Sequence, residues 1–167
     1  GTTMKIKADD LIRGIKAVSY CASTSTIKPE LGSVYVQFQG SKILFVATDS
    51  FRLAEKTVSV KQAVVEGSVL IPARSVSDIV RVLESAQGDV ETRYNEHQIS
   101  FTFDTTYLTS RLVEGAFPDY VRIVPQESST EATLLKQDLL QILKKTSIFS
   151  DRFHQVPHRT RRSGCPA

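Results

Sequence analysis

Three carboxylates, Asp49, Asp78 and Asp119, are the side chains to which acid–base catalysis could be assigned in this 167-residue chain. A catalytic carboxylate works with partners, and the sequence pairs none of them with a histidine, a cysteine or a glycine-rich phosphate loop. The residues that metal sites commonly use are scattered and lack the short spacings of ligand sets. They are His97, His154, His158, Cys21 and Cys165. We therefore predict a protein that is not an enzyme, with no catalytic residue, no metal site and no cofactor.

Recognition chemistry is concentrated instead in residues 48–53, Thr-Asp-Ser-Phe-Arg-Leu, a segment that we call the corner. Its aspartate and serine favour a turn, because short polar side chains hydrogen-bond the nearby backbone. Phe51 and Leu53 place apolar surface on either side of the permanent charge of Arg52. This combination is typical of a surface on which a partner docks.

The basic charge is unevenly distributed. Three arginines, Arg159, Arg161 and Arg162, lie in the last eleven residues, which contain no acid. Without them, residues 1–156 carry 18 basic and 18 acidic side chains. Any affinity for nucleic acid therefore depends on where the charges lie and not on their sum.

Isolated basic residues are predicted on the outer faces of three helices, opposite the apolar stripes. They are Arg13, Lys16, Arg74, Arg81 and Lys144. One interpretation is a set of solvated helix faces. The other is sequence-independent contact with phosphates, which the equivalent placement on repeated helices favours. No aromatic side chains alternate with these bases to stack on unpaired nucleotides, so duplex is favoured over single strand.

Apolar spacing divides the chain into two similar units, residues 4–60 and 67–113. Each begins with a strand, continues with an amphipathic helix and ends with three strands. The predicted strands are 5–7, 34–38, 43–48 and 52–60 in the first unit, and 68–71, 90–94, 98–103 and 107–113 in the second. The repeat predicts an α+β fold built from a pseudo-two-fold pair of βαβββ units.

A third amphipathic helix is predicted after residue 134 by Leu135, Leu139, Ile142 and Leu143, and no strands complete its unit. We predict a first domain at 1–127, whose second repeat extends over 67–125, and a linker with an isolated helix at 128–156. Residues 157–167 are basic and show no strand period. A cloning junction, truncation or frameshifted end, giving a non-native or disordered tail, is favoured there over a functional basic patch.

The composition fits a globular protein, with 41% hydrophobic and 23% charged residues. No apolar run approaches the ~20 residues of a membrane-spanning helix. The N-terminus leads into an alternating strand without a signal-peptide pattern. We therefore expect a cytoplasmic protein.

Three motifs resemble those of bacterial sliding clamps, the beta subunits of DNA polymerase III. Residues 48–54 (TDSFRLA) are similar to the family's T-D-G-x-R-L-A signature. Residues 70–76 (LIPARSV) resemble its strand-to-helix step, and residues 112–120 (LVEGAFPDY) its L-x-x-G-x-F-P-D-Y signature, followed by RIVP at 122–125. Order and spacing match across residues 4–156, so the resemblance is specific.

The resemblance implies a DNA-clamp fold without catalytic activity. Full-length members have three similar domains, and two subunits close head to tail around duplex DNA, with helices lining the hole. This chain resembles the middle domain and the first helix of the third. We therefore expect the chain alone to be a monomer that cannot encircle DNA, whereas the full-length protein forms a homodimer. The alternative is a freestanding α+β module that binds peptide or nucleic acid, which the incomplete third unit disfavours.

The resemblance also implies a groove for linear motifs of the polymerase III catalytic subunit, the clamp loader and other partners. Carried over by position, its residues here are Leu31, Thr48, Ser50, Phe51, Arg52, Leu53, Pro118, Arg122 and Ile123, with Lys28 at the rim. Apolar members would form the groove, with arginines extending beside it. For Leu53 and Ile123 the alternative is an ordinary core position. Ser50 departs from the usual glycine, and Lys28 stands where arginine is common.

Overall fold

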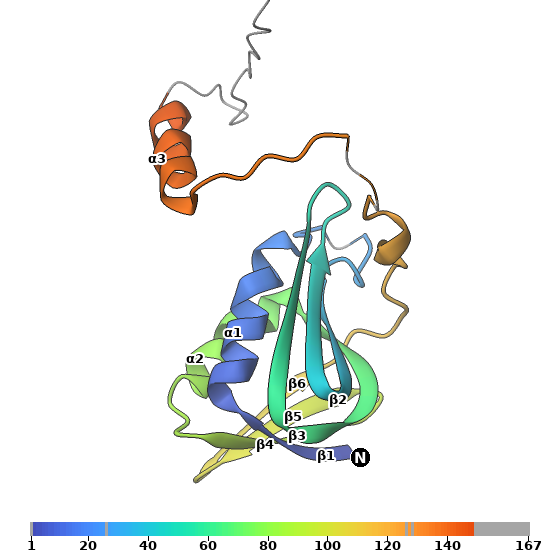
Figure 1. The fold of residues 1–167 in the computed structure, drawn as a ribbon. Helices are drawn as coiled ribbons and strands as arrows, with labels where there is room; N and C mark the ends of the chain where they lie inside the picture. The colour runs from blue at the N-terminus through green and yellow to red at the C-terminus, as the bar shows by residue number, and fades with distance from the viewer. Residues whose placement is uncertain (1, 26, 126, 128, 149–167) are drawn as a thin grey trace, which may run out of the picture. The chain divides into compact units, whose positions relative to one another are not determined.

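The structure, a computed structural model, describes residues 2–25, 27–125, 127 and 129–148. It consists of two compact units, Gly1–Tyr120 and Val121–Ala167 (Figure 1). The first unit thus ends seven residues before the predicted boundary at 127. The predicted tail, 157–167, lies outside the described residues. None of the described helices is long and apolar enough to cross a membrane.

Two helices of the first unit, α1 (Ala8–Val18) and α2 (Ala73–Leu83), lie side by side and pack on the long strands β2 and β3 (Figure 1). Both form because apolar residues recur on one face, and these residues are buried: Leu11, Ile15 and Val18 in α1, and Val76, Ile79, Val80 and Leu83 in α2. Asp9 and Asp10 lie in the first turn of α1, where carboxylates stabilise the positive end of the helix dipole. A 3-10 turn, Ser19–Cys21, follows α1.

One antiparallel sheet has the strand order β1-β4-β5-β6. Its strands are β1 (Thr2–Lys7), β4 (Asp89–Tyr94), β5 (Gln98–Phe103) and β6 (Thr106–Arg111). Alternate residues of β4 and β5 point into the core, as the period of two predicts. The predicted strand 107–113 is slightly too long, because β6 ends at Arg111 and the chain continues as a loop at Leu112 and Val113.

The other strands are two long ones, β2 (Ser33–Thr48) and β3 (Leu53–Pro72), which pair with each other antiparallel. Gln39–Ser41 was predicted to separate two strands, but it is a register shift inside β2, where Gly40 adopts φ 52. The predicted strand 52–60, except its first residue, and the predicted strand 68–71 are likewise parts of β3. In Figure 1 the ribbons of β2 and β3 both bend sharply near this register shift. Strong bends with shifted register are how bulges redirect paired strands.

Pairing across the two repeats shows the pseudo-two-fold relation. The first strand of the first repeat, β1, pairs with the second strand of the second repeat, β4. Reciprocally, residues 67–72 of β3 pair with residues 33–38 of β2. Within each repeat the last two strands pair with each other: 42–48 with 53–59, and β5 with β6. The predicted α+β pair of repeats is thereby confirmed, with β3 running through both.

The hydrophobic core lies between the helices and the strands. Phe45 of β2 is fully buried and lies directly against Gly14 of α1, where any side chain atom would collide with its ring. Glycine is therefore required at this point of α1 by close approach of helix and strand. The contact holds α1 in position over β2.

Residues 112–120 return across the surface of the first unit. Val113 N–H donates to Leu70 O at 2.9 Å. The Phe117 ring stacks on Tyr35 and meets Tyr120 edge-on. The Tyr120 hydroxyl donates to the Glu55 carboxylate at 2.7 Å. This segment is therefore fastened to β2 and β3 by ring contacts and a charge-assisted hydrogen bond.

The second unit contains one described helix, α3 (Lys136–Ser147). Its apolar stripe, Leu139, Ile142 and Leu143, is exposed. The helix predicted after residue 134 is present, and no strand lies among the described residues of this unit.

Candidate functional site

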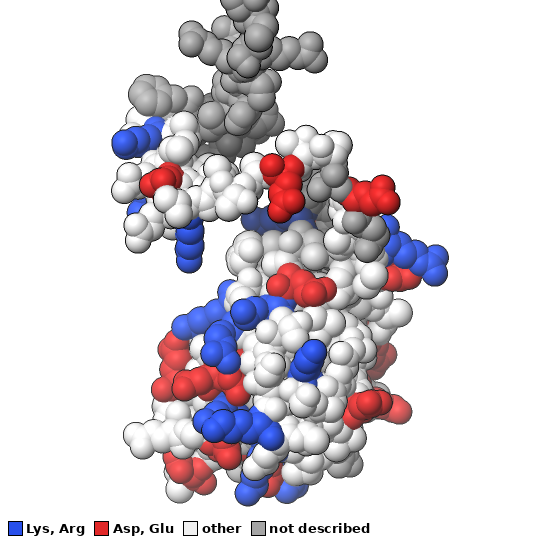
Figure 2. Space-filling view, viewed as in Figure 1, with Lys and Arg blue, Asp and Glu red and all other residues white. Residues whose placement is uncertain are grey.

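The four basic residues predicted on α1 and α2 are all exposed, but most are already paired. Arg13 donates to Asp10 at 2.6 Å and Arg81 to Asp78 at 2.9 Å, each three residues earlier on the same helix. Lys16 of α1 reaches Glu84, just after α2, at 2.5 Å. Figure 2 accordingly shows basic and acidic side chains interspersed on the first unit. This helical face is largely self-neutralised.

Arg74, the second residue of α2, differs from these three. No carboxylate partner for it exists among the described residues. The predicted Lys144 lies exposed on α3 in the second unit. The structure therefore distinguishes cations that sequence patterning treats as equivalent.

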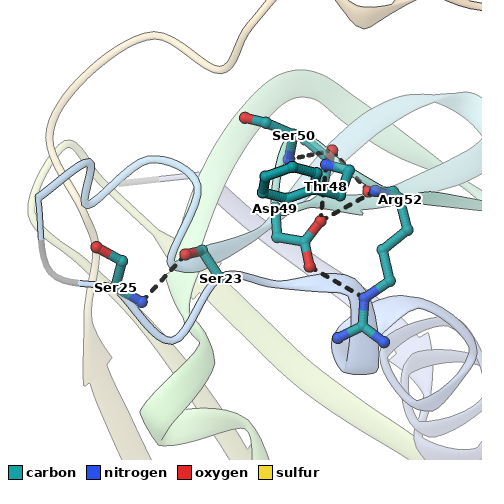
Figure 3. Close-up of polar contacts among 7 residues, drawn as sticks. Ser23, Ser25, Thr48, Asp49, Ser50 and Arg52 are labelled. Atoms are coloured by element: carbon teal, nitrogen blue, oxygen red, sulfur yellow. Dashed lines mark hydrogen bonds and ion pairs between the residues drawn. The ribbon is translucent and has the colours of Figure 1, made fainter. Parts of the chain in front are cut away.

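The corner, residues 48–53, is a turn organised by two side chains (Figure 3). The Thr48 hydroxyl donates to Arg52 O at 2.8 Å and accepts the Ser50 N–H at 3.1 Å. One carboxylate oxygen of Asp49, Oδ1, accepts the N–H groups of Phe51 and Arg52, both at 3.0 Å. Its other oxygen, Oδ2, accepts Arg52 Nε at 3.0 Å. The corner is thus held in one conformation by its own polar groups.

These contacts also set the ionisation of Asp49. The backbone N–H of Arg52, and after it that of Phe51, lower the pKa of the Asp49 carboxyl below its usual value, because both donate to the charged form. The Arg52 guanidinium acts in the same direction. The carboxylate that organises the corner is therefore ionised throughout the neutral range.

The corner has one strained residue. Ser50 adopts φ 77, a left-handed conformation that costs most L residues energy. The family resemblance places glycine here, and glycine adopts this conformation without a side-chain penalty. The serine thus retains the turn geometry at some cost in stability.

The residues predicted for the groove differ widely in exposure. Phe51 is 97% exposed, whereas Leu31 and Thr48 are each 8% exposed and therefore buried. Ser50, Arg52 and Lys28 are exposed, and Leu53 and Pro118 are half-buried. In the second unit Arg122 is exposed and Ile123 is 73% exposed. The interpretation of Ile123 as a core residue is therefore wrong for this chain.

A groove that the sequence did not predict lies in the first unit, with a cavity volume of about 740 Å³. Ser19 and Tyr20 after α1, the loop 22–25, and the start of α2 at 72–74 line it together with Arg52. We call it the arginine groove, because Arg52 and Arg74 lie on the same groove. In sequence, Ser23–Thr26 reads only as the end of a helix, and Arg52 and Arg74 belong to different predicted sites. Their convergence is a tertiary property.

Among the described residues, no group of three or more His, Cys, Asp or Glu could hold a metal ion. The arrangement of the corner and the helices is suited to binding partners through charge and apolar surface.

The fold places the chain in the class of DNA sliding clamps. The crystal structure of the sliding clamp of Bacillus subtilis matches with a TM-score of 0.84 and 28% sequence identity, covering 90% of this chain and 40% of that chain. A family model described as "DNA polymerase III beta subunit, central domain" matches residues 5–119, and the chain belongs to this family. The resemblance and fold class predicted from the motifs are therefore confirmed.

Proteins similar in sequence belong to the same family. The chain is 32% identical over 157 residues to the beta sliding clamp of Synechocystis sp., covering 85% of this chain and 40% of that protein. It is 30% identical over 150 residues to that of Bacillus subtilis, covering 88% and 39% respectively. The chain thus spans about two fifths of the length of these curated relatives.

Proposed function

We propose that this chain is the part of a DNA polymerase processivity factor that docks partner proteins and faces DNA. The single observation that carries the proposal is the corner, a turn that holds Phe51 and Arg52 exposed in one conformation. The clamp would have no catalytic activity of its own and would act in the cytoplasm as a non-catalytic accessory to the polymerase.

The corner suits recognition of a short linear motif. Phe51 offers its whole ring to a partner, and Arg52 lies beside it with Nε fixed on Asp49. Because the turn is already ordered, a partner that binds here loses little additional conformational entropy. Leu53 and Pro118 are half-buried and can contribute apolar surface, and Leu31 and Thr48 are buried members of the proposed set. Lys28, Ser50, Arg122 and Ile123 complete the proposed set.

The proposed partners are those of a clamp. They are duplex DNA, contacted without sequence preference, the catalytic subunit of DNA polymerase III, the clamp loader and other proteins with clamp-binding motifs. DNA would be encircled only by the full-length homodimer, with Arg13, Lys16, Arg74, Arg81 and Lys144 facing the phosphates.

Titration of the chain with a synthetic clamp-binding peptide from a polymerase III catalytic subunit tests the docking site. We expect weak binding, and Arg52→Ala or Leu53→Ala should abolish it. Arg93→Ala is the matched control, because Arg93 is an equally exposed arginine that pairs with a carboxylate, Glu91, on another sheet. Undiminished binding by both corner variants would refute the proposed site.

A further inference from the structure

We propose that a second groove of the first unit is a docking site for a basic, extended segment of a partner protein, whose lysine or arginine side chains bind Glu96 and Glu114. The groove has a cavity volume of about 550 Å³. We call it the glutamate groove, and its lining is Tyr35, residues 68–70, Asn95, Glu96 and residues 112–117. None of these residues belongs to the set proposed for the corner, so the inference goes beyond the proposed function.

The first argument is the charge of the groove. Its lining includes two glutamates and no lysine, arginine or histidine. The arginine groove is the reverse, with two arginines and no carboxylate in its lining. Because residues 1–156 carry equal numbers of basic and acidic side chains, attraction of a cation to the glutamate groove would be local and not an effect of net charge. The groove is therefore complementary to a positively charged ligand.

The second argument is the apolar surface that accompanies the two carboxylates. Leu70 is buried and Val113 and Phe117 are half-buried, whereas both glutamates are exposed. Lysine and arginine side chains have the matching character, because an apolar stem carries the charged head. A small cation would use the carboxylates alone and leave the apolar surface in water. A peptide that combines basic and apolar side chains therefore fits the groove better.

The third argument is the supply of free peptide groups. Residues 114–116 are exposed, and their backbone groups form no hydrogen bond within the described part of the chain. Main-chain hydrogen bonds are how an extended peptide gains affinity for a neighbouring backbone. An extended segment in the groove could therefore pair with residues 114–116 while its basic side chains reach the carboxylates.

The carboxylates themselves are available. Glu96 has no basic partner among the described residues. Glu114 Oε1 lies 3.5 Å from His97 Nδ1. A charge-assisted hydrogen bond to a carboxylate is shorter, about 2.7–2.9 Å, so this contact leaves Glu114 open to a closer donor.

The walls of the groove are already ordered. Asn95 Oδ1 accepts two backbone N–H groups, both at 2.9 Å, and these bonds fix the turn that carries Glu96. Leu112 N–H donates to His97 O at 2.8 Å, which joins the opposite wall to the same turn. A peptide would therefore bind with little reordering of the protein.

The test is a titration of the isotope-labelled full chain with an acetylated and amidated peptide of alternating leucine and arginine, followed by amide chemical shifts. We expect saturable shifts at millimolar peptide, largest at residues 95–97 and 112–117. Peptides with glutamine in place of arginine, or serine in place of leucine, should bind several-fold more weakly, because each keeps only one of the two complementary features.

Glu96→Gln should weaken binding of the arginine peptide roughly two- to fivefold, the range for exposed ion pairs, and adding Glu114→Gln should weaken it further. The Glu96 variant should keep the wild-type Tm, because the side chain is exposed and has no basic partner among the described residues. Asp104→Asn is the matched control. It removes one exposed carboxylate at the opposite end of β5, and asparagine tolerates the φ of 46 at this position. It should bind as wild type does.

An equal loss in Asp104→Asn would show attraction by overall charge and overturn the proposal. Equally tight binding of the glutamine peptide, or of the serine peptide, would overturn it too, as would the absence of saturable shifts at millimolar peptide. Arg52→Ala should leave the binding unchanged. A loss in that variant, or shifts centred on residues 48–53, would place the peptide at the corner, so failure of this inference and failure of the proposed docking site are distinguishable.

Discussion

Gly14→Ala should destabilise the first unit although alanine is the better helix former. Gly14 lies in the middle of α1 and is buried. A Cβ atom there would lie far inside van der Waals distance of three carbons of the Phe45 ring. Phe45 is 0% exposed, so its ring has no solvent-filled space into which it can turn. Helix and strand would have to separate.

Two opposing free-energy terms determine whether Gly14→Ala stabilises or destabilises the unit. Replacing glycine by alanine inside a helix gains about 1 kcal/mol of intrinsic helix stability. Forcing an extra carbon into a packed core costs about 1–3 kcal/mol, because side chains leave their preferred rotamers and the backbone has to shift. Since the collision here is with a rigid, enclosed ring, the cost lies at the upper end. The net loss should be about 1–2 kcal/mol.

Urea denaturation followed by circular dichroism measures this loss. Ser77→Ala, on the exposed face of α2, is the control, because it gains helix propensity without meeting the core. Phe45→Leu removes ring atoms from the contact, so the double variant should lose less stability than the two single losses combined. A Gly14→Ala variant as stable as wild type would refute the close approach of α1 and β2.

Three further expectations follow from the polar groups. Tyr120→Phe should lower the free energy of unfolding by about 1 kcal/mol at neutral pH. Burial and the Glu55 carboxylate raise the pKa of Tyr120 in the folded state. In alkaline denaturation titrations, the greater stability of the wild type should therefore persist below pH ~10 and disappear as the pH rises through the folded-state pKa. Thr92→Val should stabilise the fold by roughly 1 kcal/mol in urea denaturation, because Thr92 Oγ1 is buried and has no hydrogen-bond partner among the described residues. The pKa of Asp49 is lowered in the folded state, so its contribution to stability is present above pH ~4 and is lost as pH falls through the folded-state pKa. The amide chemical shifts of the corner should change over the same acid range, and Asp49→Asn should abolish that change.

Local features of the fold could be predicted from the sequence. The helical stripes at Leu11, Ile15 and Val18 required only the 3.6-residue period, and the core buries all three. The pair Asp10 and Arg13 has the three-residue spacing of a helical ion pair, so that neutralisation was also open to prediction.

Nonlocal features could not be predicted, because they depend on which strands pair. Lys16 and Glu84 are separated by 68 residues, and only the packing of α1 beside α2 joins them. The continuity of β3 was missed because Lys61, Gln62 and Glu66 look like loop, although β3 pairs with β2 on both sides of this stretch. The proximity of Arg52 and Arg74 is nonlocal too, so the sequence assigns them to separate sites.

The reciprocal strand pairing means that neither repeat is a foldable half. The sheet formed by the last three strands of the second repeat is completed by β1, which belongs to the first. In return, β3 carries residues 67–72 of the second repeat onto residues 33–38 of the first. A cut within β3 would leave two pieces with open edges, each needing the other's first strand. Unfolding of this unit should therefore be all-or-none, and its two halves, expressed separately, should regain structure only when mixed.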